Sequence, residues 1–323
     1  MAEREPSTSA SAVHGRAPPP RVALSERGVS IGLRWSGVEG AGNQILAAKL
    51  ECGPERARLV RIWRPFVDAP GRRDIVSRFA TWLAEEARWA EGRLVVGVDF
   101  SLSISETHLR QLGLLRQALR GPAVLGKHLH ERFVGTAGDF TEAAARFRAE
   151  LGRDRPRATD CYRAELWLPT SSRTHRQTFF GLCAMAHAQA SFPPWDPPAS
   201  GKPTIIEVRP GHVARALAGL CSYRDDDRDG VARPSTRAGL LRTLRTAARV
   251  EFEMEQAAQI VEDGHGDHLD AVLGATAAAA AWADDFQGVP SNVPRSEGWI
   301  HSIREEPWRS RGAQPRASAG AAG

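Results

Sequence analysis

The sequence lacks any hydrophobic stretch long enough to cross a membrane. Its longest apolar run, at 277–283, is mostly alanine and falls well short of the ~18 residues that a span requires. The first 20 residues, MAEREPSTSASAVHGRAPPP, contain no hydrophobic core of a secretory signal. We therefore expect a protein that resides in the cytoplasm and has no membrane partner.

Cysteine and lysine are also scarce. The four cysteines lie far apart and form no Cys-x-x-Cys pair: Cys52, Cys161, Cys183 and Cys221. This spacing suggests neither a zinc knuckle nor a disulfide framework. Lysine occurs only at Lys49, Lys127 and Lys202, so nearly all cations are arginine. A coding bias explains this more readily than a phosphate-binding role, although the arginine fork suits phosphate.

The charge of the chain indicates no particular partner. The net charge is +5 and the isoelectric point is near 9.4. Residues 1–27 carry four arginines and three glutamates, and residues 304–323 carry four arginines and two glutamates. Only +2 is left for residues 28–303, which is too little to argue for nucleic acid by itself.

What is present is an ordinary globular composition, with 42% hydrophobic and 25% charged residues. Residues 1–27 are rich in Ala, Ser and Pro without periodicity, and residues 304–323 are similar. Both predict disordered tails. Between them we expect one domain, 28–303, because no internal repeat or linker divides it.

The first part of this domain predicts strands before helices. Alternating apolar and small residues at 29–35 favour a strand, and a glycine-rich turn leads to strands at 44–50 and 58–63. Helical spacing at 74–89 predicts a helix. The continuous apolar run at 94–98 is typical of a strand that is covered on both faces.

The second part is expected to be mostly helical. An insertion at about 105–200 should cover the sheet, and a short strand should follow it. The elements predicted by spacing are helices at 105–120 and 140–151, an extended segment at 192–198, a strand at 204–208, and helices at 236–261 and 265–284. This order indicates an α/β domain with a layered mixed sheet.

Two carboxylates stand near the start of the last predicted helix. Asp267 and Asp270 are spaced i and i+3 in the segment GHGDHLDA, so they share one helix face. Two acidic residues at a helix start could cap it or favour its dipole.

Two further acidic residues belong to predicted strands. Asp99 follows the buried strand, at the end where sites form in α/β sheets, although it could simply begin a turn. Glu207 lies within the short apolar strand Ile-Ile-Glu-Val and must reach a partner or an opening, because burial of an unpaired charge is costly. An ion pair with Arg209 or Arg215 is the alternative.

Together these segments resemble a known bacterial family. The patterns WSG-x-x-x-AG, GVDFSLS, YRAE, EVRP and GDHLDA, in this order from about residue 29 to residue 299, resemble the family called domain of unknown function 429. The segment EGWI at 297–300 belongs to the same resemblance and ends it. Members of that family are predicted to be nucleases with a ribonuclease H-like fold. The resemblance therefore implies a mixed sheet with helices on both faces and a helical insertion.

The resemblance also implies a catalytic site. In such folds, carboxylates from the first strand, the fourth strand and the last helix gather around Mg²⁺ or Mn²⁺. Two such ions can activate a water and stabilise the leaving oxygen of a phosphodiester. Asp99 matches the fourth-strand acid, Asp267 and Asp270 match the helix pair, and Glu207 matches a glutamate on a later strand. Asp99, Asp267 and Asp270 would hold the metal, and Glu207 would assist catalysis.

The first strand departs from the family. Arg34 stands where the family usually has an aspartate before Trp-Ser-Gly. In the strand alternation, Ser30, Gly32 and Arg34 share one face, so the guanidinium should point where that acid would. Arginine cannot lose its proton, and it would repel a metal ion.

Three arginines form a possible nucleic-acid contact. Arg242, Arg245 and Arg249 are spaced i, i+3 and i+7 in the predicted helix 236–261. They could follow a phosphate backbone or form a solvated helix face. Other candidates are weaker: His265 and His268 could be ligands or helix-start residues, and the stretch from Lys127 to His130 could bind metal or form an exposed loop.

Two hypotheses from different classes follow. The chain could be a divalent-metal-dependent nuclease or phosphodiesterase that Arg34 impairs. It could instead be a non-catalytic member of the same fold that binds nucleic acid or a protein partner. The resemblance alone connects the residues to a function, and the substrate is not specified by the sequence.

Overall fold

The computed structural model describes residues 28–37, 40–69, 71–137, 139–153, 155–162, 172–219, 222–225 and 230–303. The two predicted tails, 1–27 and 304–323, lie outside the described residues. Within the described ranges, no helix is both long enough and apolar enough to cross a lipid bilayer.

A mixed sheet runs through the molecule, and its seven strands come from both ends of the described chain. The strands are β1 (Gly28–Arg34), β2 (Leu46–Cys52), β3 (Ala57–Trp63), β4 (Leu94–Val98), β5 (Thr204–Val208), β6 (Val250–Glu251) and β7 (Ile300–His301). Their spatial order is β6-β3-β2-β1-β4-β5-β7. Only β2 runs antiparallel to its neighbours; β4 pairs in parallel with both β1 and β5. The expected α/β class is confirmed.

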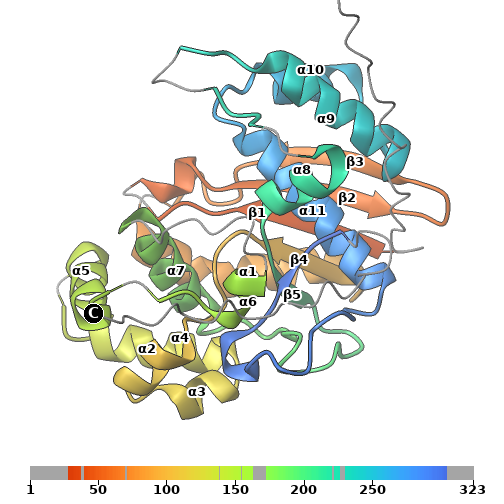
Figure 1. Cartoon of the computed structure of the whole chain (residues 1–323). Helices are drawn as coiled ribbons and strands as arrows, with labels where there is room; N and C mark the ends of the chain where they lie inside the picture. Colours follow the sequence, from red (N-terminus) through yellow and green to blue (C-terminus); the bar gives the residue numbers. More distant parts are fainter. Residues whose placement is uncertain are drawn as a thin grey trace, which may run out of the picture.

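Helices cover this sheet on both faces (Figure 1). They are α1 (Arg72–Trp89), α2 (Glu106–Gln111), α3 (Leu115–Leu119), α4 (Pro122–Leu129), α5 (Phe140–Leu151), α6 (Ala158–Tyr162), α7 (Ser172–Met185), α8 (Pro210–Ala218), α9 (Pro234–Ala247), α10 (Met254–Glu262) and α11 (Asp267–Ala283). Helices α2 to α7 lie between β4 and β5 in sequence, within the region where the sequence predicts mostly helices.

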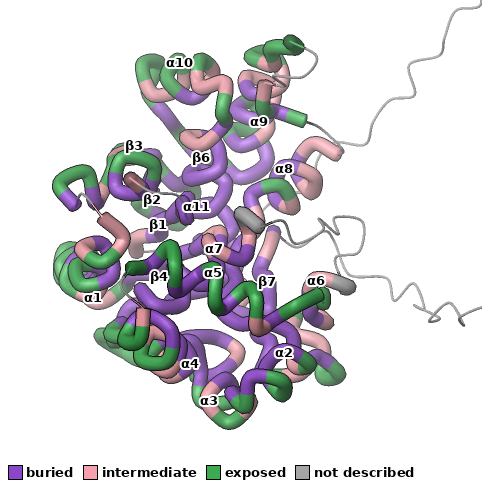
Figure 2. The backbone as a smooth tube through the Cα atoms, turned by 90° about the vertical axis from the view of Figure 1, so that its left-hand side faces the viewer, coloured by how far each residue is buried: buried purple, intermediate pink, exposed green. Residues whose placement is uncertain are grey.

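The strand alternation divides the core into two layers. Ile31 and Leu33 of β1 pack with α1, α4 and α7 on one face. Val95 of β4 and Ile206 of β5 pack with α8, α9 and α11 on the other. Strands β4 and β5 and most of α11 are continuously buried, and Figure 2 shows them in the interior. Burial on both faces explains the continuous apolar run of β4.

Helix α11 lies directly against β1 because neither element has a side chain at the contact. A Cβ on Gly32 would come within 1.9 Å of the Ala271 carbonyl oxygen. Gly274 on the helix faces the Cα of Gly32. This close approach brings the first turn of α11, with its two aspartates, beside the end of β1.

Several predicted elements are wrong in extent. The expected helix 105–120 is two short helices, because the chain turns at Gly113 with φ 70°. The expected helix 236–261 ends at Ala247; Arg249 has φ 51°, and β6 then pairs with β3 before α10 begins. Residues 193–195 form a turn within the segment that was expected to be extended.

Other elements were not anticipated. Lys127 and His128 lie in α4, and His130 begins a π-helical turn (His130–Val134), so this stretch is not a loop. Helices α7 and α8 and strands β6 and β7 were also not predicted from the sequence. Strands β6 and β7 have two residues each, which is too short for a period to appear.

Candidate functional site

Three parallel strands end at one edge of the sheet, where the residues of interest gather. Arg34 ends β1, Asp99 directly follows β4, and Glu207 lies in β5. Because these strands are parallel neighbours, their carboxyl ends meet at the same edge. The first turn of α11 adds Asp267 and Asp270. Residues up to 236 positions apart in the chain therefore meet at one place.

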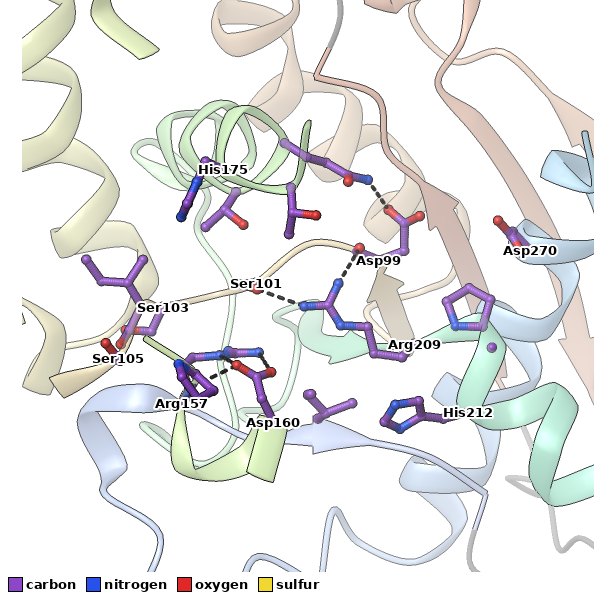
Figure 3. A pocket seen from close by; sticks show the side chains of 18 of the residues that line it. Asp99, Ser101, Ser103, Ser105, Arg157, Asp160, His175, Arg209, His212 and Asp270 are labelled. Atoms are coloured by element: carbon purple, nitrogen blue, oxygen red, sulfur yellow. Dashed lines mark hydrogen bonds and ion pairs between the residues drawn. The ribbon is translucent and has the colours of Figure 1, made fainter. Parts of the chain in front are cut away.

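A pocket of about 440 Å³ opens at this edge (Figure 3). Arg34, Asp99 and Asp270 line it, whereas Asp267 and Glu207 are connected to it through ion pairs with lining residues. The remaining charged or imidazole side chains of the lining are Arg155, Arg157, Asp160, Arg209, Arg224, His108, His175 and His212. Five arginines therefore face three aspartates around the cavity.

Arg34 points toward α11, as the strand alternation predicts. Its Nε lies 2.8 Å from Oδ1 of Asp267, and the two side chains are 7% and 21% exposed. Its NH1 also donates to the Trp35 carbonyl oxygen at 3.2 Å. The guanidinium thus occupies the space beside the helix carboxylates where the family resemblance would place an acid.

Arg224 is a second cation at the same carboxylates. Its NH2 forms an ion pair with Asp270, and its NH1 lies 3.5 Å from Oδ1 of Asp267. Its NH1 further donates to the His265 carbonyl oxygen at 2.9 Å. Tyr223 donates its hydroxyl hydrogen to Oδ1 of Asp270 at 2.6 Å.

Sequence reasoning missed this pair, because Tyr223 and Arg224 belong to no periodic element. Their segment is held by Arg237, a buried side chain of α9. Arg237 NH1 donates to the Tyr223 carbonyl oxygen at 2.9 Å and to Asp225 at 2.7 Å. The sequence offers one indication of this segment: Arg237 lies on the apolar side of a helix, where an unpaired charge would be costly, so it must have a partner.

The two lining aspartates of this edge have raised pKa values. Burial raises the pKa of Asp270 to about 7, although Arg224 and the Tyr223 hydroxyl act in the opposite direction. Burial also raises the pKa of Asp99, opposed by Arg34 and by the Trp35 N–H that donates to it at 2.7 Å. Both carboxyls are therefore easier to protonate than an exposed aspartate.

Glu207 is fully buried, and both of its carboxylate oxygens accept hydrogen bonds. Arg157 donates to both of its oxygens, at 2.6 and 2.7 Å, and the Leu102 N–H donates at 3.0 Å. Arg209, the partner considered from the sequence, lies 3.1 Å away. Arg157 also pairs with Asp160 of α6. This network joins β5 to α6. It contains the ion pair with Arg209 that the sequence offered as an alternative, and Arg157 is a further partner that the sequence did not indicate.

Figure 3 shows how Arg209 connects two parts of the pocket wall. Its NH1 donates to the Asp99 carbonyl oxygen at 3.1 Å, and its NH2 donates to Ser101 at 2.8 Å. Gln177 of α7 donates to the Trp35 carbonyl oxygen at 2.7 Å and to Oδ1 of Asp99 at 3.4 Å. Long polar side chains from α7 and from the residue after β5 therefore hold the segments that follow β1 and β4.

These residues do not fit a divalent metal as they are arranged. Mg²⁺ and Mn²⁺ require several oxygen ligands directed at one point. In the described ranges, no group of three or more His, Cys, Asp or Glu side chains is placed to hold an ion. Asp267 and Asp270 face the guanidinium groups of Arg34 and Arg224 instead of a shared centre. A metal here would also meet two permanent positive charges.

The predicted arginine stripe is divided by the end of α9. Arg245 lies on the helix over the Phe252 ring, with its CZ 5.2 Å from the ring centroid. Arg249 lies beyond the helix and donates to the Glu55 carbonyl oxygen at 3.3 Å. Both line a separate hollow with Glu55 and other glutamates, whereas Arg242 does not. A role of these three arginines in nucleic-acid binding stays a prediction.

Comparison with known proteins gave no match: no protein-family model, curated protein or solved structure matches the chain. The resemblance to the domain of unknown function 429 therefore stays a prediction from the sequence motifs, and the site has to be interpreted from its own geometry.

Proposed function

We propose that this chain is a ribonuclease H-like domain that binds nucleic-acid phosphates at the arginine-lined pocket and does so without a divalent metal. One observation carries the proposal: Arg34 and Arg224 form ion pairs with Asp267 and Asp270 where the resemblance implies a metal site. A charge-assisted contact between guanidinium and carboxylate satisfies both groups without any ion.

The order of the elements supports the proposed fold. The first strand, the strand that follows the first long helix, and the last long helix bring their residues to one edge. That is the arrangement that the resemblance expects of the metal-binding carboxylates. The fold-level likeness is an analogy, whereas the ion pairs are properties of this site.

The lining of the pocket supports an anionic ligand. Arg155 is exposed, the Arg224 side chain is 47% exposed, and the Arg209 side chain is 25% exposed, so these three can reach a bound phosphate. Arginine suits phosphate because its planar fork donates two parallel hydrogen bonds.

The test measures binding of labelled single-stranded DNA, double-stranded DNA and RNA by fluorescence anisotropy, in EDTA and in Mn²⁺, over a range of salt concentrations. We expect equal affinity in EDTA and Mn²⁺. The affinity should fall steeply with salt, and Arg224→Ala should lower the logarithmic salt slope by about one. Arg116→Ala, an exposed arginine of α3 outside the pocket, is the matched control.

The same binding measurements, together with a cleavage assay in Mn²⁺, distinguish the other hypotheses. If Arg245→Ala lowers the slope and Arg224→Ala does not, nucleic acid binds at the hollow beside α9 and the pocket proposal fails. No binding of any oligonucleotide at low salt would also reject it. Mn²⁺-dependent cleavage by the wild-type chain that Asp270→Asn abolishes would establish a metal-dependent nuclease instead.

A further inference from the structure

The far side of the pocket carries a serine and a histidine that the proposed binding function does not use. Ser105 and His108 both line the cavity. Figure 3 shows Ser105 at the end away from Asp270. Oγ of Ser105 lies 3.0 Å from Nδ1 of His108, within hydrogen-bond reach.

The partners of His108 fix which nitrogen carries the proton. Its Nε2 lies 2.9 Å from the carbonyl oxygen of Arg153. A carbonyl oxygen can only accept, so Nε2 must be the protonated nitrogen of the neutral ring. Nδ1 then presents a lone pair, and Ser105 is the group that donates to it. The result is a hydroxyl, a base and a group that orients the base, in the order that activates a serine nucleophile.

Helix capping accounts for only part of this geometry. Ser105 is the N-cap of α2, and its Oγ accepts from the His108 N–H at 3.4 Å. That contact requires no imidazole. The contact with Arg153, 45 residues away, holds the ring in one orientation toward the serine. Nearby Ser103 is also buried in the pocket wall, but its hydroxyl donates to the Ser296 carbonyl oxygen at 2.6 Å and it has no such base.

We propose that Ser105 is a nucleophile activated by His108, and that this end of the pocket hydrolyses small carboxylic esters that carry an anionic group. Arg155, an exposed arginine, lines the same cavity and favours a negatively charged substrate. The inference goes beyond the proposed nucleic-acid binding and does not depend on it.

The reaction balances with water as the only co-reactant. Oγ of Ser105 attacks the ester carbonyl carbon while its proton passes to Nδ1 of His108. The tetrahedral adduct collapses, the bond to the alcohol oxygen breaks, and that oxygen takes the proton from Nδ1. Nδ1 then takes a proton from water, whose oxygen attacks the acyl carbon. The bond from that carbon to Oγ breaks, Oγ takes the proton back from Nδ1, and the acid is released. The Arg153 carbonyl stabilises the intermediate imidazolium by accepting from Nε2.

A fluorophosphonate probe tests the nucleophile directly on the full chain. The serine oxygen displaces fluoride, so the adduct appears as one mass increase that peptide mapping assigns. We expect labelling at Ser105. Ser105→Asn should abolish it while an asparagine still caps α2, and His108→Gln should slow it by about 100-fold or more. Ser103→Ala should label like the wild type.

A hydrolysis assay tests the substrate class. We expect mono-4-nitrophenyl succinate to be cleaved faster than 4-nitrophenyl acetate, and Ser105→Asn to remove both activities. Thermal melting checks that each variant is folded. The proposal is overturned if the folded wild type takes no label, if labelling is unaffected by His108→Gln, or if the adduct maps elsewhere. Equal rates for the two esters would refute the anionic substrate class.

Discussion

Arg34 is a buried cation on a strand where the family resemblance expects an aspartate. Its side chain is 7% exposed and pairs with Asp267. We predict that Arg34→Ala lowers the free energy of unfolding by about 3 kcal/mol, because the mostly buried carboxylate of Asp267 loses the 2.8 Å contact with Arg34 and keeps the longer, 3.5 Å contact with Arg224. Urea denaturation measures this. The double variant Arg34→Ala/Asp267→Ala should recover part of the loss, and a loss below about 0.5 kcal/mol in the single variant would show that the pair is not important for stability.

The substitution Arg34→Asp tests whether the arginine takes the place of a metal ion. It replaces a cation by a carboxylate beside Asp267, which creates a group that can attract Mn²⁺. We expect Mn²⁺ to raise the melting temperature of Arg34→Asp by several degrees and to leave the wild type unchanged, because only a protein that binds the ion gains stability from it. Strong stabilisation of the wild type by Mn²⁺ would contradict the pairing described here.

Asp270 makes stability depend on pH. Its folded-state pKa of about 7 lies above the unfolded value, so the folded state binds more protons between about pH 4 and 7. The protonated form of Asp270 therefore stabilises the folded state. This stabilisation is fully present below about pH 4 and is lost as the pH rises through about 7. Wild type should lose about 2–4 kcal/mol relative to Asp270→Asn between pH 4.5 and 8. Denaturation of both proteins at several pH values tests this, and parallel pH profiles would contradict it.

At the level of elements, the contact of α11 with β1 positions the site. Gly32 touches the helix backbone, so a methyl group there has to push the two apart. We predict that Gly32→Ala costs about 3 kcal/mol or more, as overpacking against rigid backbone does. Gly239→Ala in α9 is the control: its nearest new contact is 3.7 Å away, and it should stabilise by about 0.5–1 kcal/mol. Equal stability of the two variants would mean that α11 can shift freely on the sheet.

At the level of the whole molecule, one sheet contributes side chains to both core layers. Ile31 of β1 belongs to one layer, whereas Val95 and Ile206 belong to the other. Because loss of the sheet exposes both layers, we predict one unfolding transition, in agreement with a single domain at 28–303. Near-ultraviolet circular dichroism, which reports on aromatic packing around Trp35, should coincide with the far-ultraviolet signal from the helices. Two separate transitions would indicate that the 105–200 insertion unfolds independently.

The sequence by itself determined the α/β class and the approximate position of its central strands. Alternation over seven residues marked β1, and a continuous apolar run marked β4, because burial on one or two faces leaves these patterns locally. The spacing of Asp267 and Asp270 placed both on one helix face for the same reason. The alternation also placed Arg34 on the same strand face as Ser30 and Gly32, and the structure shows that α11 covers this face.

Only the tertiary structure decided the partners of these charges. Arg224 lies 46 residues from Asp270, and Arg157 lies 50 residues from Glu207, so no local period relates them. The division of the 236–261 stretch was equally hidden, because its break depends on pairing between β6 and distant β3. Local patterns record which side of an element is buried. Which groups meet across the fold is set by packing and by charge compensation between elements, and that is why the same aspartates that suggest a metal site from sequence form ion pairs with arginine in the folded chain.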